Sequence, residues 1–310
     1  MRPAMKEMVW GGKLLQERFG KQIPSDTTGE AWEVAAHPHG QSTVADGALE
    51  GAELQTLVDQ YQEELVGTKV YAAYGNYFPL LIKFIDANQN LSVQVHPNDA
   101  QAVELEGPGA SGKTEMWYVL DAKPGARLVY GFNRDLTAEE LKNALEQGTL
   151  ESFLNWVDVH PGDTFYIPAG TLHAIGSGIL IAEIQQNSDL TYRVYDYNRL
   201  GLDGKPRQLH VEKAVAVVDR KAPIGREKAD IDQGVISPFF ETYRRTVDGT
   251  WSLPVSPERF EILICVGGAG SLTCGTQTLS VQEGDSFLIP ATAGTVVADG
   301  QMQLLQTHVK

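Results

Sequence analysis

Residues 161–168 read Pro-Gly-Asp-Thr-Phe-Tyr-Ile-Pro, and residues 283–290 read Glu-Gly-Asp-Ser-Phe-Leu-Ile-Pro. Six of the eight positions are identical or conservatively matched, and Ala follows both copies. Further upstream, Glu115 is echoed by Glu261. In each copy the Gly-Asp pair favours a tight turn into a short strand, and the Ile-Pro pair ends that strand. The chain therefore contains an internal repeat, which predicts two related β-barrels.

Short apolar or alternating runs surround the first copy and predict further strands of the same kind. These runs are residues 80–85, 91–95, 116–120, 164–167 and 179–184. Helices are expected at only three places, because helical spacing of apolar residues or a capping box is found only there. The three places are residues 51–66, 137–147 and 210–218. The predicted fold class is mostly β, with two barrels and a few short helices.

The two copies of the repeat differ at one position that matters for chemistry. The first copy continues into His173, whereas the corresponding position in the second copy is Thr295. A metal-binding function that uses this histidine is therefore possible only in the first barrel. We expect a catalytic metal-binding domain with helical elaborations at residues 1–235, and a degenerate barrel without metal ligands at residues 236–310, joined through a polar stretch at about residues 219–235.

The composition is that of an ordinary globular protein, with 42% hydrophobic and 21% charged residues in a chain of 310. The 25 Lys and Arg against 40 Asp and Glu give a net charge of −15, which argues against nucleic acid or a membrane as a partner. An anionic ligand would need a local group of positive side chains. The start of the chain lacks the apolar core of a signal peptide, and no apolar run is long enough to span a membrane, so we expect a cytoplasmic protein.

Two cysteines, Cys265 and Cys274, flank a glycine-rich stretch that has the composition of a hairpin turn. Two thiols make neither a disulfide framework nor a thiolate zinc site. We expect both to be reduced.

Three segments of the first barrel carry side chains of metal-binding types. Gln94 and His96 are two residues apart on a predicted strand, so they point to the same face. Lys113 and Glu115 share a face by the same argument, and His173 follows the strand-ending proline of the repeat. Two imidazoles, a carboxylate and an amide oxygen suit zinc or another borderline divalent metal. The absence of a His173 counterpart in the second copy favours a metal site in the first barrel.

The other histidines have no partner at ligand spacing, so we expect them to be structural or solvated. His37 and His39 are expected in a solvated turn, and His308 in the tail. The polar, aromatic segment 183–199 contains Arg193. It is either an exposed loop with weak surface ion pairs or a pocket rim in which Arg193 faces an anion, and spacing alone leaves both open.

Several ordered motifs resemble those of the class I mannose-6-phosphate isomerases, in the short bacterial form with two cupin (jelly-roll) barrels. The resemblance runs through about the first 200 residues, and the remainder of the chain is similar to a degenerate second cupin. The motifs are Leu-Ser-Val-Gln-Val-His-Pro at 91–97, Gly-Lys-Thr-Glu-Met-Trp-Tyr at 112–118, Ile-Pro-Ala-Gly-Thr-Leu-His-Ala at 167–174 and Asn-Ser-Asp-Leu-Thr-Tyr-Arg-Val-Tyr-Asp at 187–196.

The resemblance also implies roles for individual residues. It implies one zinc ion per chain, with ligands at His96, Glu115 and His173, and with Gln94 as a further ligand in longer relatives. The residue matching Arg193 is catalytic in the family. Polar substrate-binding positions of the family fall on Ser92, Lys113, Glu183 and Asp189. One departure is Thr114, where longer relatives have proline, and we expect it to tilt Lys113 without removing Glu115.

The reaction implied by the resemblance is the interconversion of mannose 6-phosphate and fructose 6-phosphate through an enediolate. The expected partner is therefore a small sugar phosphate. A zinc ion near the two reacting oxygens would act as a Lewis acid, and Arg193 would stabilise the same negative charge. We expect Lys113 and Ser92 to bind the phosphate. Either Glu183, with a pKa raised by burial, or a water on the metal would act as the general base.

Two other functions are compatible with the residues. The first is an iron-dependent cupin oxygenase, although Gln94 stands where such sites usually have the first histidine of a His-x-His pair. The second is a non-enzymatic, sugar-binding bicupin with a structural metal, which would need no catalytic cation at Arg193.

Overall fold

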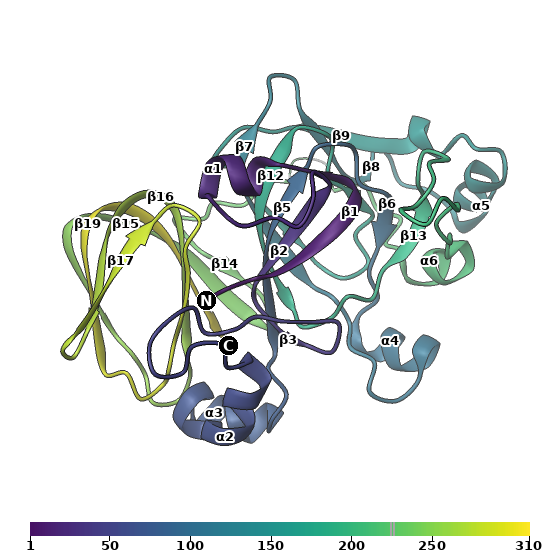
Figure 1. Ribbon diagram of the computed structural model, residues 1–310. Coiled ribbons are helices and arrows are strands. Elements are labelled where there is room, and N and C mark those ends of the chain that lie inside the picture. The colour runs from purple at the N-terminus through teal and green to yellow at the C-terminus, as the bar shows by residue number, and fades with distance from the viewer. Residues whose placement is uncertain (224, 226) are drawn as a thin grey trace.

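The computed structural model describes residues 1–310 except 224 and 226. Figure 1 shows an N-terminal unit and a smaller C-terminal unit side by side, and both are built from antiparallel strands. The mostly β fold class predicted from the sequence is confirmed. The helices are α1 (Leu14–Phe19), α2 (Leu54–Val66), α3 (Thr68–Tyr74), α4 (Asp99–Glu106), α5 (Ala138–Glu146) and α6 (Val211–Val217), with a 3-10 turn at Leu150–Phe153.

The N-terminal unit is a jelly roll of two sheets. The first sheet has the order β1-β2-β5-β12-β7-β10 and the second has the order β13-β6-β11-β8-β9. Apolar side chains from both sheets, such as Val119 and Leu128, pack in a common core between them. The strands are β1 (Ala4–Gly12), β2 (Thr28–Val34), β5 (Leu80–Ala87), β6 (Val93–Val95), β7 (Glu115–Ala122), β8 (Arg127–Phe132), β9 (Leu154–Asp158), β10 (Thr164–Ile167), β11 (His173–Ala174), β12 (Ile179–Gln186) and β13 (Tyr192–Tyr195), with a separate hairpin of β3 (Ala36–His37) and β4 (Gly40–Gln41).

The C-terminal unit is built around three long strands. These are β15 (Phe240–Pro254), β16 (Glu261–Cys274) and β19 (Thr295–Val309), and β19 pairs with both of the others. The shorter strands β14 (Val235–Ile236), β17 (Gln277–Gln282) and β18 (Ser286–Ile289) complete the unit.

The internal repeat is preserved in the register of the strands. Glu115 pairs with Ile167 in the first copy, and Glu261 pairs with Ile289 in the second. The turn glycine that precedes the strand has a φ of 91° in the first copy and 90° in the second. Glycine is favoured there because it reaches positive φ without a steric penalty. The repeated sequence therefore encodes the same turn and the same strand pairing twice.

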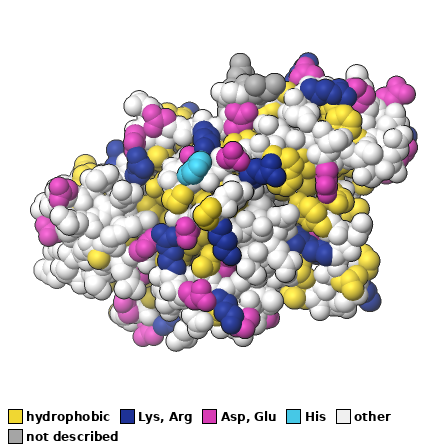
Figure 2. Space-filling view, turned by 90° about the horizontal axis from the view of Figure 1, so that it is seen from above, with side chains coloured by type: hydrophobic (Ala, Val, Ile, Leu, Met, Phe, Trp, Pro, Cys, Tyr) yellow, Lys and Arg dark blue, Asp and Glu magenta, His cyan; other side chains and the backbone are white. Residues whose placement is uncertain are grey.

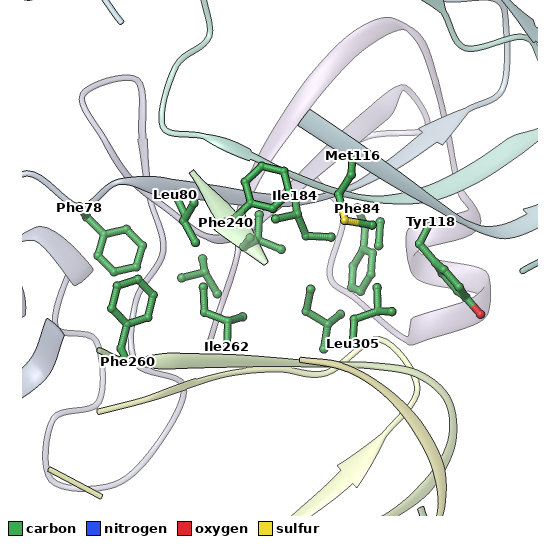
Figure 3. Packing of buried hydrophobic residues seen from close by; sticks show 14 of the residues in the cluster. Phe78, Leu80, Phe84, Met116, Tyr118, Ile184, Phe240, Phe260, Ile262 and Leu305 are labelled. Carbon is green, nitrogen blue, oxygen red and sulfur yellow. The ribbon is translucent and has the colours of Figure 1, made fainter. Parts of the chain in front are cut away.

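An apolar core joins the two units. Phe78 of the N-terminal unit stacks on Phe260 of the C-terminal unit with ring centroids 4.9 Å apart. A polar contact lies beside this core, where Ser286 Oγ donates a hydrogen bond to Glu33 Oε2 at 2.8 Å. Figure 3 shows apolar side chains of the N-terminal unit, Leu80, Phe84, Met116 and Ile184, opposite Ile262 and Leu305 of the C-terminal unit.

The three predicted helices are present as α2, α5 and α6. The predicted capping box of α5 is also present, because Thr137 accepts from the backbone of Glu140 and the Glu140 carboxylate accepts from the backbone of Thr137. The sequence did not predict α1, α3 and α4. These helices are short and bury few apolar side chains, and α4 buries only Ala102, so they lack a clear helical periodicity.

Two local expectations in the C-terminal unit are wrong. Cys265 and Cys274 lie on one strand, β16, and the glycines between them continue that strand against β19 instead of turning. Both thiols are free, as expected. His308 is not in an exposed tail but is buried in β19, with Nδ1 3.2 Å from Glu261 Oε2. Within the expected linker at about 219–235, residues 224 and 226 lie outside the described part of the chain.

The surface carries both signs of charge. On the face shown in Figure 2, basic and acidic side chains are interspersed around apolar ones. Across the described residues, no helix combines the length and the apolar character that crossing a membrane requires.

Candidate active site

The three metal ligands expected from the sequence meet inside the N-terminal unit. His96 follows β6, Glu115 begins β7 and His173 begins β11. The distance from His96 Nε2 to Glu115 Oε2 is 3.6 Å, and the distance from His173 Nε2 to Glu115 Oε1 is 3.4 Å. All three side chains are buried. Their ligand atoms lie within 4.8 Å of one another, so one ion can contact all three.

Backbone carbonyls fix the tautomers of both imidazoles. The Nδ1–H of His96 donates to the carbonyl of Leu190 at 2.8 Å, and the Nδ1–H of His173 donates to the carbonyl of Thr171 at 2.9 Å. In a neutral imidazole, a proton on Nδ1 leaves the lone pair on Nε2. Both Nε2 atoms therefore face Glu115 as lone-pair donors. Metal-binding histidines are commonly oriented by such a second hydrogen bond.

The charge state of this group also suits a metal ion. Burial lowers the pKa of His173 to about 4 and the pKa of His96 well below its ordinary value, so both rings are neutral at pH 7. Glu115 Oε1 is buried without a hydrogen-bond partner, which costs free energy unless a cation compensates it. Two neutral imidazoles and a buried carboxylate form a donor set that fits zinc.

Gln94 lies beside this group. It pairs with His173 across β6 and β11, and its Nε2 is 3.4 Å from His173 Nε2. The Oγ of Ser92 donates to Gln94 Oε1 at 3.3 Å. In this orientation the amide nitrogen faces the imidazole, so Gln94 would present its oxygen to a metal only after the amide group rotates.

Alternating buried charges extend from the metal ligands into the pocket. Lys113 Nζ lies 2.6 Å from Glu115 Oε2, and Glu183 Oε1 lies 3.6 Å from Lys113 Nζ and 3.4 Å from Lys83 Nζ. Burial opposes the charge of Glu183, but these two lysines hold its pKa below the ordinary value. The expectation that burial raises the pKa of Glu183 is therefore wrong. Its other oxygen accepts a hydrogen bond from Trp117 Nε1 at 2.9 Å.

Arg193 lies on β13, one strand away from Gln94 and two strands away from His173. It is opposite Gln94 in the pairing of β13 with β6. Its Nε donates to Ser92 Oγ at 3.1 Å, and its Nη1 donates to the carbonyl of Gln208 at 3.0 Å. Of the two interpretations that the sequence left open, the geometry supports the pocket wall, because Arg193 lines the same cavity as the lysines.

Asp189 meets two histidines that the sequence analysis had placed in a solvated turn. His39 Nδ1 lies 2.5 Å from Asp189 Oδ2, and His37 Nε2 lies 3.7 Å from Asp189 Oδ1. That interpretation is wrong for His37, which is buried, whereas His39 is exposed. The backbone N–H of His39 donates to His37 Nδ1 at 3.1 Å, so neutral His37 carries its proton on Nε2. This nitrogen faces Asp189 as a donor and has no lone pair for a metal.

The polar residues of the site, apart from His96, Glu115 and His173, line a cavity of about 330 Å³, a size that suits a small ligand. The sequence-predicted residues on its wall are Ser92, Gln94, Lys113, Glu183, Asp189 and Arg193. The same cavity is lined by Trp10 and Trp32, and by Lys83, Arg207 and His210, which were not predicted from the sequence. Lys83 could have been identified from the sequence as a candidate site residue, because it is the one charged residue in the apolar run 80–85. Arg207 and His210 reach the cavity through contacts with Asp196 and Arg193 and carry no local signal.

Comparison with known proteins identifies the family. The family model for the catalytic domain of phosphomannose isomerase type I matches residues 1–125, and the mannose-6-phosphate isomerase cupin domain matches residues 230–309. The mannose-6-phosphate isomerase of Streptococcus mutans is 38% identical over 311 residues, which cover 98% of this chain and 96% of the relative. This chain belongs to the type I phosphomannose isomerases.

Relatives from Bacillus subtilis (strain 168) support the same assignment for this phosphomannose isomerase. A mannose-6-phosphate isomerase of that organism is 39% identical, with 99% of this chain and 98% of the relative covered. The crystal structure of the mannose 6-phosphate isomerase from Bacillus subtilis has a TM-score of 0.86 at 36% identity and covers 99% of this chain and 100% of that one. The family and the two-cupin fold that the sequence motifs indicated are thereby confirmed.

The two cupins of this phosphomannose isomerase are not chemically equivalent. Thr295 opens β19 in the second cupin at the position that His173 occupies in the first. Among the described residues, both groups of side chains with metal-ligand spacing belong to the N-terminal unit.

Proposed function

We propose that this phosphomannose isomerase interconverts mannose 6-phosphate and fructose 6-phosphate, and that it depends on one zinc ion held by His96, Glu115 and His173. The observation that carries the proposal is the convergence of two Nε2 lone pairs on one buried carboxylate. This group is in contact with Lys113 and Gln94, which line a polar cavity. We assign the chemistry to residues 1–235 and a supporting role to residues 236–310.

Zinc suits the donor set, and Gln94 is the proposed fourth ligand. A solved mannose 6-phosphate isomerase with the same fold, 21% identical at a TM-score of 0.76, is described as bound with zinc and yttrium, which supports this choice. When bound, zinc supplies Lewis-acid stabilisation of negative charge on the sugar oxygens.

Arg193 is the proposed catalytic cation. Isomerisation moves a proton between C2 and C1, so negative charge develops on the adjacent oxygens. A guanidinium keeps its charge at every working pH. Arg193 is held by Ser92 and by the Gln208 carbonyl, so its orientation is set before the sugar binds. A preorganised charge of this kind lowers a barrier by about 3 kcal/mol.

Glu183 is the proposed group that takes the proton from C2 and returns it at C1. Trp117 holds one of its oxygens, while Oε1 is buried without a hydrogen-bond partner. Because Lys113 and Lys83 lower the pKa of Glu183, the carboxyl is ionised before the reaction and its protonated form returns the proton readily. We assign Asp189, Ser92 and Lys113 to binding and orienting the sugar within the same cavity.

The deciding experiment is a coupled assay of fructose 6-phosphate released from mannose 6-phosphate. We expect a chelator to abolish turnover and added zinc to restore it, and we expect His173→Ala to lose both bound zinc and activity. His160→Ala is the matched control, because His160 is an exposed histidine of the same unit, and it should retain both.

Three outcomes would contradict the proposal. Full activity of metal-free protein would refute metal dependence. Oxygen consumption on addition of iron would favour the cupin oxygenase. Sugar binding without turnover in the zinc-loaded protein would favour the non-enzymatic bicupin.

A further inference from the structure

We infer that Arg207 and His210, which lie next to Arg193, form the subsite for the phosphate group and select 6-phosphorylated sugars. This inference rests on the proposed function and deepens it. Neither Arg207 nor His210 has a family motif or ligand spacing in the sequence, and both line the cavity that contains the other site residues.

The order of strands places this subsite at the right distance from the metal ligands. His173 pairs with Gln94, and Gln94 pairs with Arg193, so Arg193 is two strands away from His173. Strands are about 4.8 Å apart, which gives a separation of about 10 Å between the two backbones. The six bonds from C2 to phosphorus in a hexose 6-phosphate, each about 1.5 Å long, span about 7 Å when extended. The Arg193 side chain points back towards Gln94 through Ser92, and His210 lies at the Arg193 backbone. A sugar whose C2 lies at the metal ligands therefore reaches the segment of His210 and Arg207 with its phosphate.

The segment that carries Arg207 and His210 returns to this edge of the sheet. The backbone N–H of His210 donates to the carbonyl of Arg193 at 2.7 Å, and the backbone N–H of Arg193 donates to His210 Nδ1 at 3.3 Å. Because Nδ1 accepts a hydrogen bond, neutral His210 carries its proton on Nε2. The ring thus offers an N–H donor, which suits a phosphate oxygen.

Positive charge is in excess at this end of the cavity. Asp196 accepts two hydrogen bonds from Arg207, at 2.7 and 2.6 Å, and one from Arg199 at 2.9 Å. One carboxylate thus faces two guanidinium groups. Arg193 is also near, because burial and then the charge of Arg207 lower the pKa of Arg193. Arg207 uses Nε and Nη2 for Asp196, which leaves Nη1 for a ligand. Fixed guanidinium donors are well suited to phosphate.

The other end of the cavity is a poor place for a phosphate. Lys113, which the sequence analysis assigned to phosphate binding, is 2.6 Å from Glu115 and 3.6 Å from Glu183. Lys83 is similarly placed, 3.5 Å from Glu30 and 3.4 Å from Glu183. The charges of both lysines are therefore compensated by buried carboxylates, and these carboxylates would repel a dianion.

The test is Arg207→Ala, measured by the KM for mannose 6-phosphate, by kcat, and by calorimetric binding of inorganic phosphate to the zinc-loaded enzyme. We expect the KM and the Kd for phosphate to rise together by about 10- to 100-fold, the range expected for a lost charge-assisted contact, while kcat changes by less than about threefold.

Arg207→Lys keeps the charge but loses the two-pronged contact with Asp196. It should recover most of the phosphate affinity if charge at the subsite is the cause. Lys205→Ala removes the same charge from an exposed position of the same segment and should behave like the parent enzyme.

Several results would overturn the inference. They are an unchanged KM and an unchanged phosphate Kd in Arg207→Ala, a fall in kcat at constant KM, or equal losses in Arg207→Ala and Arg207→Lys. The proposed function fails separately, if the parent enzyme does not turn over mannose 6-phosphate. In that case phosphate binding to the parent protein but not to Arg207→Ala still supports the subsite.

Discussion

Histidine tautomers distinguish metal ligands from supporting residues in this molecule. His96 and His173 donate through Nδ1 to backbone carbonyls, so each presents a lone pair at Nε2. His37 accepts a backbone N–H at Nδ1, so its Nε2 carries a proton. Two groups with similar ligand spacing therefore differ in chemistry. The first group can hold a metal, whereas His37 in the second group can only donate to Asp189.

Two substitutions should separate the roles proposed for the pocket side chains. Arg193→Ala should keep zinc and lose turnover by about two orders of magnitude, because it removes one charge stabiliser. Glu183→Gln should also keep zinc, but it should abolish exchange of the C2 hydrogen with solvent, which Arg193→Ala should only slow. Metal analysis together with proton exchange followed by NMR measures both effects. Turnover within a few-fold of the parent in Arg193→Ala, or unchanged exchange in Glu183→Gln, would show that the assigned role is wrong.

Among individual residues, the sequence predicted which neighbouring side chains share one face of a strand. Gln94 and His96 share a strand face and meet His173 as expected, because side chains on a strand alternate with a period of two. Contacts between distant segments could not be derived. Asp189 meets His39, a residue 150 positions away, and Lys83 meets Glu183 only through the pairing of β5 with β12. The pKa of Glu183 depends on those contacts, so its lowering could not be predicted from the sequence.

Among the elements, α5 was predictable because its start is encoded by adjacent residues. The carboxylate of Glu140 accepts the backbone N–H of Thr137 at 2.8 Å and contacts Arg134 at 2.9 Å. The helix α4 has the same device, with Asn98 and Gln101 as the reciprocal pair. It was missed because its sequence lacks an apolar stripe. A capping signal alone therefore did not suffice to predict a helix.

The cap of α5 should make the stability of the chain depend on pH. The backbone N–H of Thr137, followed by Arg134, lowers the pKa of Glu140 to about 2, from an ordinary value of 4.5. A lowered carboxyl pKa stabilises the folded state above the unfolded pKa, and this contribution is lost as the pH falls from about 4.5 towards 2. The difference in free energy of unfolding between the parent and Glu140→Gln should therefore be constant above pH 5 and shrink below it. Urea unfolding at a series of pH values measures it, and a difference that does not vary with pH would contradict the assignment.

For the whole molecule, the central feature is the apolar core between the two cupins. Phe78, Phe260 and Leu305 are fully buried there and come from both units (Figure 3). The sequence indicated two barrels through the repeat, but it did not indicate which faces they share. That information lies in contacts between residues almost 200 positions apart. We expect the two units to unfold together, since separating them exposes this core to water.

Phe260→Ala should test this coupling. Removing a fully buried aromatic ring costs about 3–5 kcal/mol of stability, and the loss should appear in both units as one shifted urea transition. Trp251 is the only tryptophan of residues 236–310 and Trp117 is buried in the N-terminal unit, so single-tryptophan variants report on each unit. Leu279→Ala, at an exposed position, is the control and should change stability little. Separate transitions for the two reporters in the parent protein would show that the units are independent.

The shared register of the two copies shows that the backbone geometry does not depend on the side chain at the position of His173. The second copy keeps the turn, the strand pairing and a buried glutamate at Glu261, with Thr295 at the position of His173. The turn and the strand pairing therefore do not require a histidine at this position. Substitutions in the second copy should therefore leave the N-terminal site intact, provided that they keep the apolar face that packs against the first cupin.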